Sequence, residues 1–144
     1  MKVRRILATK GMRVITIAPD KKIRDAVAVL AEHNIGALVV ADAAGQPVGI
    51  LSERDVIRKA AENEQVFDLF VSDLMTRDVI TGMPQDDTHS VARTMTDRHF
   101  RHMPIMDEGR LIGIVSIGDI LKAERDQYRG EIDTLETQIM ADKD

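Results

Sequence analysis

The sequence predicts an α+β fold of two similar halves with pseudo-two-fold symmetry, each a small sheet plus two helices, followed by a long C-terminal helix. The main observation is an internal repeat, because the pattern of apolar residues and turns that follows Pro19 recurs after Pro84. The second is composition. A chain of 144 residues that is 44% hydrophobic and 31% charged can build the core of one domain or of two packed halves.

Each repeat is expected to open with a short strand and an amphipathic helix. Residues at helical spacing form one face in each half, namely Ile23, Ala26, Val27, Leu30 and Ala31 in the first and Thr88, Val91, Ala92, Met95 and Thr96 in the second. Asp20 is expected to cap the first helix, and Asp86 or Asp87 the second, because a carboxylate accepts hydrogen bonds from the free N–H groups of a first helical turn.

A β-hairpin and a closing helix follow in each half. In the first half, an apolar run predicts a buried strand over Ile35–Asp42, turn residues follow over Asp42–Gly45, and a second strand is expected over Pro47–Ser52. In the second half, the corresponding strand, turn and strand are expected over Phe100–Asp107, Asp107–Gly109 and Leu111–Ser116. The closing helices are expected to begin at Ser52 and Ser116. A half of this size buries little surface alone, so the two halves are expected to cover each other's sheets.

Two segments lie outside the repeat. The connector carries Phe67, Leu69, Phe70, Leu74 and Met75, which predict a short docked helix rather than a flexible linker. From Ile117 onward the pattern predicts one long helix, with Gly130 as its weak point. Along it, Leu121, Tyr128, Ile132, Leu135 and Ile139 recur at heptad-like steps. This stripe predicts either a coiled-coil seam between two copies or a helix that packs back on its own chain.

Composition excludes several classes of protein. The absence of Cys removes disulfides, thiolate nucleophiles and Cys-based metal sites. A net charge of −4, no Trp, one Tyr and three Phe argue against a nucleic-acid partner, because both a basic footprint and stacking platforms are lacking. No apolar run is long enough to span a membrane, and the basic N-terminus has too short an apolar stretch for a signal peptide. We therefore expect a cytoplasmic protein.

The two hairpins end in the same motif, Gly49-Ile-Leu-Ser-Glu-Arg-Asp55 and Gly113-Ile-Val-Ser-Ile-Gly-Asp119. With the strands before them, these motifs resemble a tandem pair of CBS (cystathionine β-synthase) domains, similar to small stand-alone bacterial CBS-pair proteins. The resemblance implies a first CBS motif over 7–61, a connector over 62–78, a second CBS motif over 79–122 and a helical tail over 123–144. It also implies a disc-like, often dimeric module with two clefts that can bind adenosine derivatives.

The Ser-x-x-Asp elements at Ser52–Asp55 and Ser116–Asp119 have a physical rationale as binding sites. A helix N-terminus offers free N–H groups to a phosphate, and an ionised carboxylate can accept hydrogen bonds from two adjacent ribose hydroxyls. The same spacing also fits a simple helix cap, and the two roles are compatible. The family places the ribose on this Asp, so the resemblance assigns that role to Asp55 and Asp119, with Ser52 and Ser116 beside them.

The resemblance implies the other members of each cleft. The Asp119 cleft would use Lys10, Met12, Ile35, Gly36, Arg101, His102 and Ile114, and the Asp55 cleft would use Gly36, Ala37, Ile50, Arg54, Arg77, Phe100 and Arg101. Arg101 and His102 stand where the first half has Gly36 and Ala37. Since a phosphate needs cationic partners, we expect the Asp119 cleft to be the better equipped. The alternative for Arg101 is an ordinary surface arginine.

These features predict a regulatory or sensor module that is not an enzyme. Its ligand would be an adenine nucleotide (AMP, ADP, ATP or NAD), and its partners a second copy, as a homodimer, and a regulated protein. No catalytic set or phosphate-binding glycine loop is present. No metal is expected, because His89, His99 and His102 lack a metal-binding spacing. The alternative is a ligand-free dimerising scaffold for protein–protein interaction.

Overall fold

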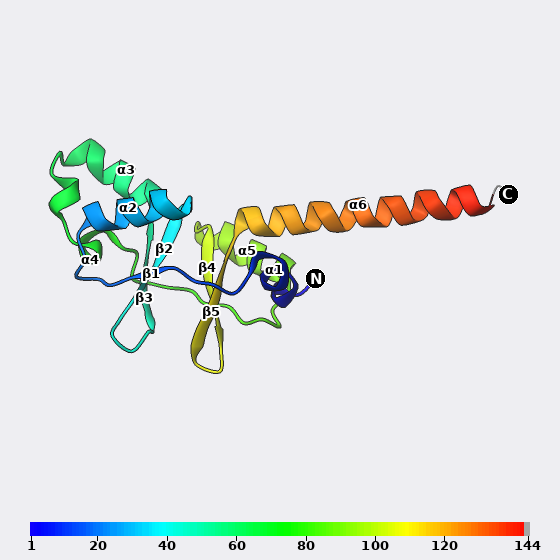
Figure 1. Cartoon of the computed structure of the whole chain (residues 1–144), viewed down its shortest axis with the longest axis horizontal. Helices are drawn as coiled ribbons and strands as arrows, with labels where there is room; N and C mark the ends of the chain where they lie inside the picture. The colour runs from blue at the N-terminus through cyan, green and yellow to red at the C-terminus, as the bar shows by residue number, and fades with distance from the viewer. Residues whose placement is uncertain (143–144) are drawn as a thin grey trace.

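The computed structural model describes residues 1–142 and consists of two β-hairpin units side by side, with helices around them and one helix projecting away (Figure 1). The first unit contains β1 (Thr16–Ile17), α2 (Ile23–His33), β2 (Ala37–Ala41), β3 (Pro47–Ser52) and α3 (Glu53–Glu62). The second contains α5 (Thr88–Arg98), β4 (His102–Asp107), β5 (Arg110–Ser116) and α6 (Ile117–Asp142). Three further helical segments are α1 (Val3–Lys10), η1 (Val66–Asp68) and α4 (Val71–Leu74).

The sheets confirm the predicted hairpins. In the first sheet β1 lies parallel to β2, and β2 pairs antiparallel with β3. In the second, β4 pairs antiparallel with β5, and the place of β1 is taken by Gly82 alone, whose N–H donates to Pro104 O at 2.9 Å and whose carbonyl accepts from Met106 N at 2.8 Å. The predicted opening strand is therefore a strand in the first half and a single bridge in the second.

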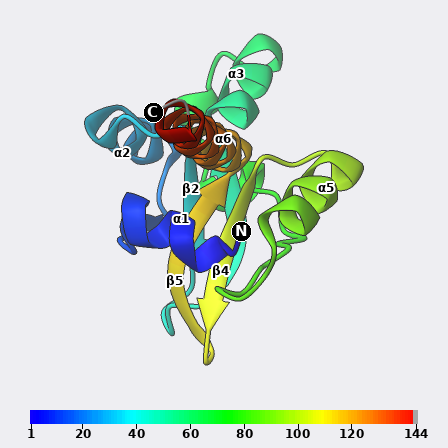
Figure 2. The ribbon, with the colours of Figure 1, turned by 90° about the vertical axis from the view of Figure 1, so that its right-hand side faces the viewer.

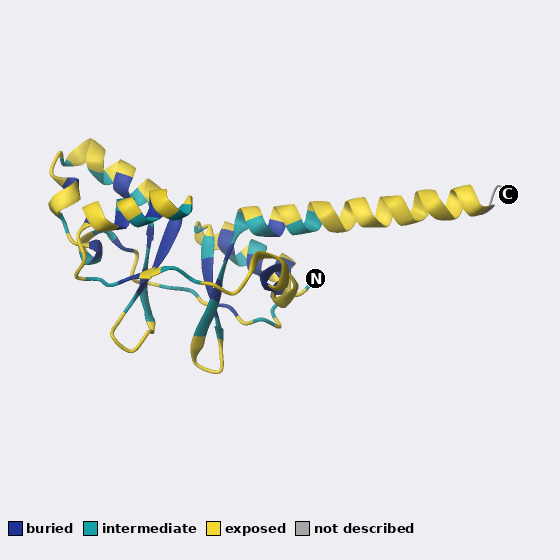
Figure 3. Ribbon diagram, in the orientation of Figure 1, coloured by how far each residue is buried: buried dark blue, intermediate teal, exposed yellow. Residues whose placement is uncertain are grey.

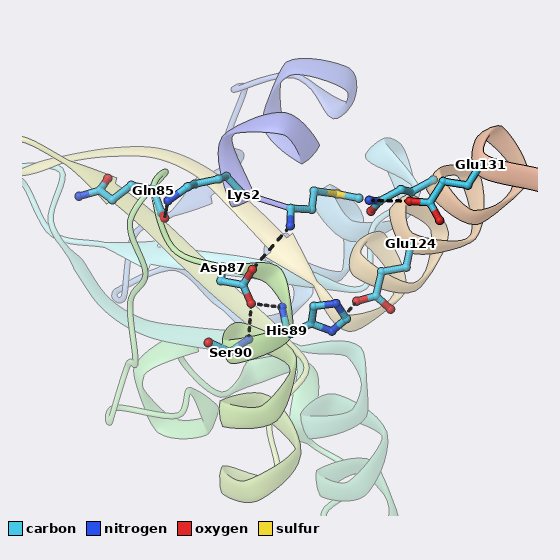
Figure 4. Close-up of polar contacts among 9 residues, drawn as sticks. Lys2, Gln85, Asp87, His89, Ser90, Glu124 and Glu131 are labelled. Atoms are coloured by element: carbon cyan, nitrogen blue, oxygen red, sulfur yellow. Dashed lines mark hydrogen bonds and ion pairs between the residues drawn. The ribbon is translucent and has the colours of Figure 1, made fainter. Parts of the chain in front are cut away.

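Of the two predicted helix caps, the structure confirms one and contradicts the other. Asp87 caps α5, because its Oδ2 accepts hydrogen bonds from His89 N and Ser90 N, as predicted (Figure 4). The expected cap by Asp20 is wrong. The carbonyl of Lys21 accepts a hydrogen bond from Val71 N, and Lys22 pairs with Phe70, so the chain stays extended until α2 begins at Ile23.

The connector and the N-terminal helix exchange places between the halves. η1 and α4 pack into the first core through the buried Val66 and Val71, which confirms that the connector is docked. Helix α1, which the sequence analysis did not predict, packs through Val3, Ile6 and Leu7 into the second core. Figures 1 and 2 both place α1 beside β5, with which it is also in contact. Each half is thus completed by a helix that lies next to the other half in the sequence.

The first glycine of each Gly-x-x-Ser-x-x-Asp motif is where these helices touch the hairpins. A Cβ added to Gly49 would lie 2.5 Å from the Sδ of Met75, at the end of α4. A Cβ added to Gly113 would lie 2.6 Å from Cδ2 of Leu7 in α1. Real Cβ atoms do not approach other atoms this closely, so these side chains can lie here because the strand carries glycine.

The tail is one continuous helix, as predicted, and it does not pack back on its own chain. Ala123 and Glu124 are half-buried at its root, and every described side chain beyond them is exposed (Figure 3). A polar contact between His89 Nδ1 and Glu124 Oε1, which are 3.3 Å apart, joins α5 to this root (Figure 4). The interpretation of the apolar stripe as a self-packing face is therefore wrong.

Substituting Gly113→Ala should lower the free energy of unfolding by about 1–3 kcal/mol, since the added methyl group overpacks a full core against the buried Leu7. Urea unfolding measures the effect. The matched control is Gly118→Ala in α6, where the added Cβ would make only an ordinary contact, 3.6 Å from Ser116 Oγ. Equal stability of the Gly113→Ala variant and the native chain would contradict the tight packing.

Candidate functional site

The two Ser-x-x-Asp elements form matching capping boxes at the starts of α3 and α6. Ser52 N donates to Asp55 Oδ2 at 2.9 Å and Asp55 N donates to Ser52 Oγ at 3.2 Å. The corresponding distances for Ser116 and Asp119 are 2.9 and 3.0 Å. In both boxes only Oδ2 of the aspartate is engaged within the described chain, so Oδ1 of each partly exposed carboxylate remains an available acceptor.

In both halves, the residue just before the first strand of the hairpin is hydrogen-bonded to the first residue of the closing helix. Glu53 N donates to Gly36 O, and Ile117 N donates to Arg101 O, each at 2.9 Å. Next along each strand, Ala37 pairs with Ser52, and His102 pairs with Ser116. Gly36-Ala37 and Arg101-His102 are therefore equivalent positions, as the repeat predicted.

The two half-sites meet at Gly36. A Cβ at this position would lie 3.5 Å from Glu53 Oε1 and 4.0 Å from His102 Nε2. The glycine thus leaves space between an acid of the first half and an imidazole of the second. Glu53 was not among the predicted site residues, because its equivalent in the second half is the apolar Ile117 and the repeat gave no signal for it.

Lys10 makes the strongest charged contact of the region. From the end of α1 its Nζ donates to Asp119 Oδ2 at 2.6 Å and to the carbonyl of Ile114 at 2.8 Å. The contact joins residues that are 109 positions apart in the sequence. Within the described residues no ion pair involves Asp55, so the two half-sites differ in charge as well as in sequence.

The surroundings lower the pKa of two ionisable groups, Asp119 and His102. Partial burial acts to raise the pKa of Asp119, but the hydrogen bonds from Lys10 and Ser116 and the charge of Lys10 outweigh it and hold the pKa below its usual value. Burial lowers the pKa of His102, and Lys10 lowers it further, against the opposing effect of Asp119 and Glu53. At neutral pH the site therefore presents an ionised Asp119, a cationic Lys10 and an uncharged His102.

The structure brings together only some of the residues predicted for the Asp119 cleft. Lys10, Ile114, Ser116 and Asp119 are in direct contact, and His102 and Gly36 adjoin them. Arg101 is exposed beside them. Met12 instead lines an open crevice of about 300 Å³ between the two hairpin turns. Ile35 lines another, of about 280 Å³, between α2 and α3.

The residues predicted for the Asp55 cleft are more dispersed. Ala37 is buried next to Ser52, and Ile50 is bonded through its backbone to Thr76. Arg77 donates to the carbonyl of Ser72 at 3.1 Å, and Arg54 is exposed. Phe100 packs against the second core. This half-site thus keeps its capped carboxylate without a paired cation.

The geometry suits binding better than catalysis. A carboxylate with one available oxygen, a helix N-terminus and a lysine on a neighbouring helix can hold hydroxyl and phosphate groups. No three His, Asp or Glu side chains among the described residues lie close enough together to hold a metal ion. In the same residues, no helix has the length and apolarity needed to cross a membrane.

Comparison with known proteins decides the family. The family model for the CBS domain matches residues 3–62 and 71–126. The chain belongs to the CBS domain family. Its two matched regions correspond to the two halves of the fold and together form a tandem CBS pair.

Similar proteins share this pair. The crystal structure of the CBS-domain containing protein ATU1752 from Agrobacterium tumefaciens has a TM-score of 0.83 and 39% identity, covering 86% of this chain and 99% of that one. The CBS domain pair of protein MJ0100, in complex with 5′-methylthioadenosine and S-adenosyl-L-methionine, has a TM-score of 0.77 and 30% identity, covering 88% and 98%. The mitochondrial CBSX3 of Arabidopsis thaliana is 35% identical over 125 residues, which are 83% of this chain and 61% of that protein. The chain thus spans less than two thirds of this curated relative.

Replacing Asp119 by Asn should cost about 1 kcal/mol of unfolding free energy at pH 7, after allowance for solvent screening of a partly exposed group. Because the folded-state pKa is lowered, the contribution of the carboxylate is fully present above about pH 3.9, the ordinary value, and is lost as the pH falls through the folded value. Urea unfolding between pH 7 and pH 3 measures the difference.

The matched comparison for this prediction is the same substitution in a Lys10→Met background. Without the cation, the pH-dependent part of the difference should shrink. A cost of Asp119→Asn that stays the same at every pH would show that the carboxylate is not stabilised as an anion.

Proposed function

We propose that this CBS pair is a regulatory module, without catalytic activity of its own, that binds an adenosine-containing ligand with the ribose on Asp119. The observation that best supports this proposal is the capped carboxylate of Asp119, which keeps Oδ1 available at a helix N-terminus beside Lys10. The complex of the MJ0100 pair with two adenosine derivatives supports this ligand class. AMP, ADP, ATP and NAD all carry the required adenine and ribose.

The residues around Asp119 suggest how such a ligand would be held. The two ribose hydroxyls would donate to Asp119 Oδ1, and the apolar Ile114 would lie against the adenine. Gly36 allows a ligand to approach between the halves, since a side chain there would meet Glu53 and His102. Lys10 and the exposed Arg101 are the cations within reach of a phosphate.

The contact between Lys10 and Asp119 offers a route from binding to regulation. Lys10 belongs to α1 and Asp119 to α6, so a ligand that accepts a hydrogen bond from Lys10 or donates one to Asp119 changes the interaction between these helices. A ligand shifts such an equilibrium by as much as its affinity differs between the two arrangements. The ligand would therefore act on the position of α1 and of the projecting helix.

The remaining parts of the proposal concern assembly and location. We infer a homodimer that acts on a protein partner in the cytoplasm, with CBS motifs over 7–61 and 79–122. The Asp55 half-site would bind more weakly, because it has the same capped carboxylate but no paired cation.

A ligand-free dimerising scaffold is the second candidate function. The observation in its favour is that Lys10 already occupies Oδ2 of Asp119, so the chain satisfies this carboxylate without a ligand. A scaffold would use the exposed surface of α6 and leave the half-sites empty.

The test compares Asp119→Ala with Asp55→Ala by calorimetry and thermal shift, using AMP, ATP, NAD and S-adenosyl-L-methionine as probes. Asp119→Ala should weaken binding at least about tenfold, since it removes charge-assisted hydrogen bonds, and Asp55→Ala should weaken it less. A ligand at about 100 times its dissociation constant stabilises the native chain by roughly 2.7 kcal/mol.

The matched control for that test is Asp73→Ala. Asp73 Oδ2 accepts a hydrogen bond from Phe70 N at 2.8 Å in α4, so its loss removes a helix cap away from both half-sites. This variant should lose stability but keep the affinity for nucleotide. Absence of any thermal shift with all four probes at millimolar concentration would favour the scaffold, and a larger effect at Asp55 would reverse the order of the half-sites.

A further inference from the structure

The projecting part of α6 carries an apolar stripe that this chain leaves uncovered. Tyr128, Ile132, Leu135 and Ile139 are 60, 54, 58 and 56% exposed. They recur at steps of four, three and four residues, so they lie on one face of the helix. Single exposed apolar residues are normal, but an aligned series along a projecting helix marks an interaction surface.

The projecting part of α6 gains no stability from packing on the rest of the described chain. Its root packs into the second core through Ile120 and Ala123, but the residues beyond Glu124 gain no packing from the rest of the described chain. In proteins most of the stability of a helix comes from the packing of its apolar face, and Gly130 lowers the intrinsic stability of this helix. An apolar face buried against another helix would supply the missing stabilisation.

The stripe fits a heptad repeat. Ile132 and Ile139 occupy a positions, and Leu121, Tyr128 and Leu135 occupy d positions. Gly130 falls at an f position, on the side away from the seam, and no atom would lie within 4 Å of a Cβ there. The weakest residue of the helix is thus outside the proposed contact.

We propose that this face binds the same face of a second copy in an antiparallel coiled coil. The register that matches the stripe places Ile132 against the partner's Leu135 and Tyr128 against the partner's Ile139. Two-fold symmetry repeats both contacts, so all four apolar residues are covered by apolar residues. The proposal specifies the contact of the homodimer inferred under the proposed function and does not depend on its ligand.

Charge decides the direction of the two helices. In the antiparallel register Arg129 and Glu136 both occupy e positions, and Arg129 lies beside the partner's Glu136, which gives two attractive pairs by symmetry. In a parallel pair, Glu131 would face the partner's Glu136, and Arg125 at an a position would face the partner's Arg125 in the seam. The antiparallel arrangement removes both repulsions.

The first experiment measures the dimer dissociation constant of the full chain by analytical ultracentrifugation. Ile132→Asp should raise it by more than about a hundredfold, because each copy loses a buried apolar side chain and gains a charge in the seam. The matched control is Thr134→Asp, which adds the same charge on the opposite face and should leave the constant unchanged. An unchanged constant for Ile132→Asp, or a monomeric native chain, would overturn the proposal.

The second experiment tests direction through charge. Glu136→Lys should weaken the antiparallel dimer about three- to tenfold, since Arg129 would then face a lysine, and the double variant Arg129→Glu with Glu136→Lys should restore it. In a parallel dimer, Glu136→Lys would instead relieve the repulsion with Glu131. A tighter dimer for Glu136→Lys would therefore overturn the antiparallel assignment.

The third experiment uses the absence of native Cys. Chains carrying Tyr128→Cys mixed with chains carrying Ile139→Cys should form a disulfide between unlike chains on mild oxidation, because these positions face each other in the antiparallel register. Tyr128→Cys alone should stay uncrosslinked, whereas a parallel dimer would crosslink it readily. None of these variants alters the half-sites, so nucleotide shifts measured on them report the ligand proposal separately.

Discussion

The approach of a helix side chain to a strand glycine is the contact on which the rest of this structure depends. Leu7 reaches Gly113, and Met75 reaches Gly49, at distances that any Cβ would forbid. These contacts hold α1 on the second half and α4 on the first. Because each helix comes from the chain beside the other half, the two small cores are completed by an exchange of helices rather than by two independent domains.

The same exchange builds the candidate site. Helix α1 packs on the second half through Leu7, and this packing brings Lys10, one turn later, to Asp119 and to the carbonyl of Ile114. In the first half α4 ends at Leu74, so no equivalent lysine reaches Asp55. The repeat therefore preserves the capping boxes in both halves, while the unequal lengths of α1 and α4 make the half-sites chemically different.

Local sequence patterns predicted most of the fold, and long-range contacts account for what they missed. The hairpins and the capped helix starts depend on neighbours in the chain, so their residues carry a readable signal. The spacing of the apolar residues in α1 and α4 is the same, with Val3, Ile6 and Leu7 matching Val71, Leu74 and Met75. This similarity predicts equivalent positions in the fold only once it is known that each helix packs on the other half. Asp20 failed as a cap because the pairing of Lys22 with Phe70 delays the helix, which no local pattern shows. Likewise, the resemblance assigned Lys10 and Asp119 to the same cleft, but only the tertiary structure shows that they form an ion pair. The position of Glu53 near Gly36 is also visible only in the tertiary structure.

The position of α1 has a consequence for the order in which the chain folds. Helix α1 precedes every other described element, but it packs against β5 and α6, which come last among them. The apolar face of α1, which carries Val3, Ile6 and Leu7, therefore stays unburied until these later elements have been synthesised, since domains acquire their contacts as the chain emerges. For the first half the delay is short, because α4 lies in the connector between the two halves. Closure of the second half over α1 is thus expected to follow the folding of the first half, and its large sequence separation makes it a slow step.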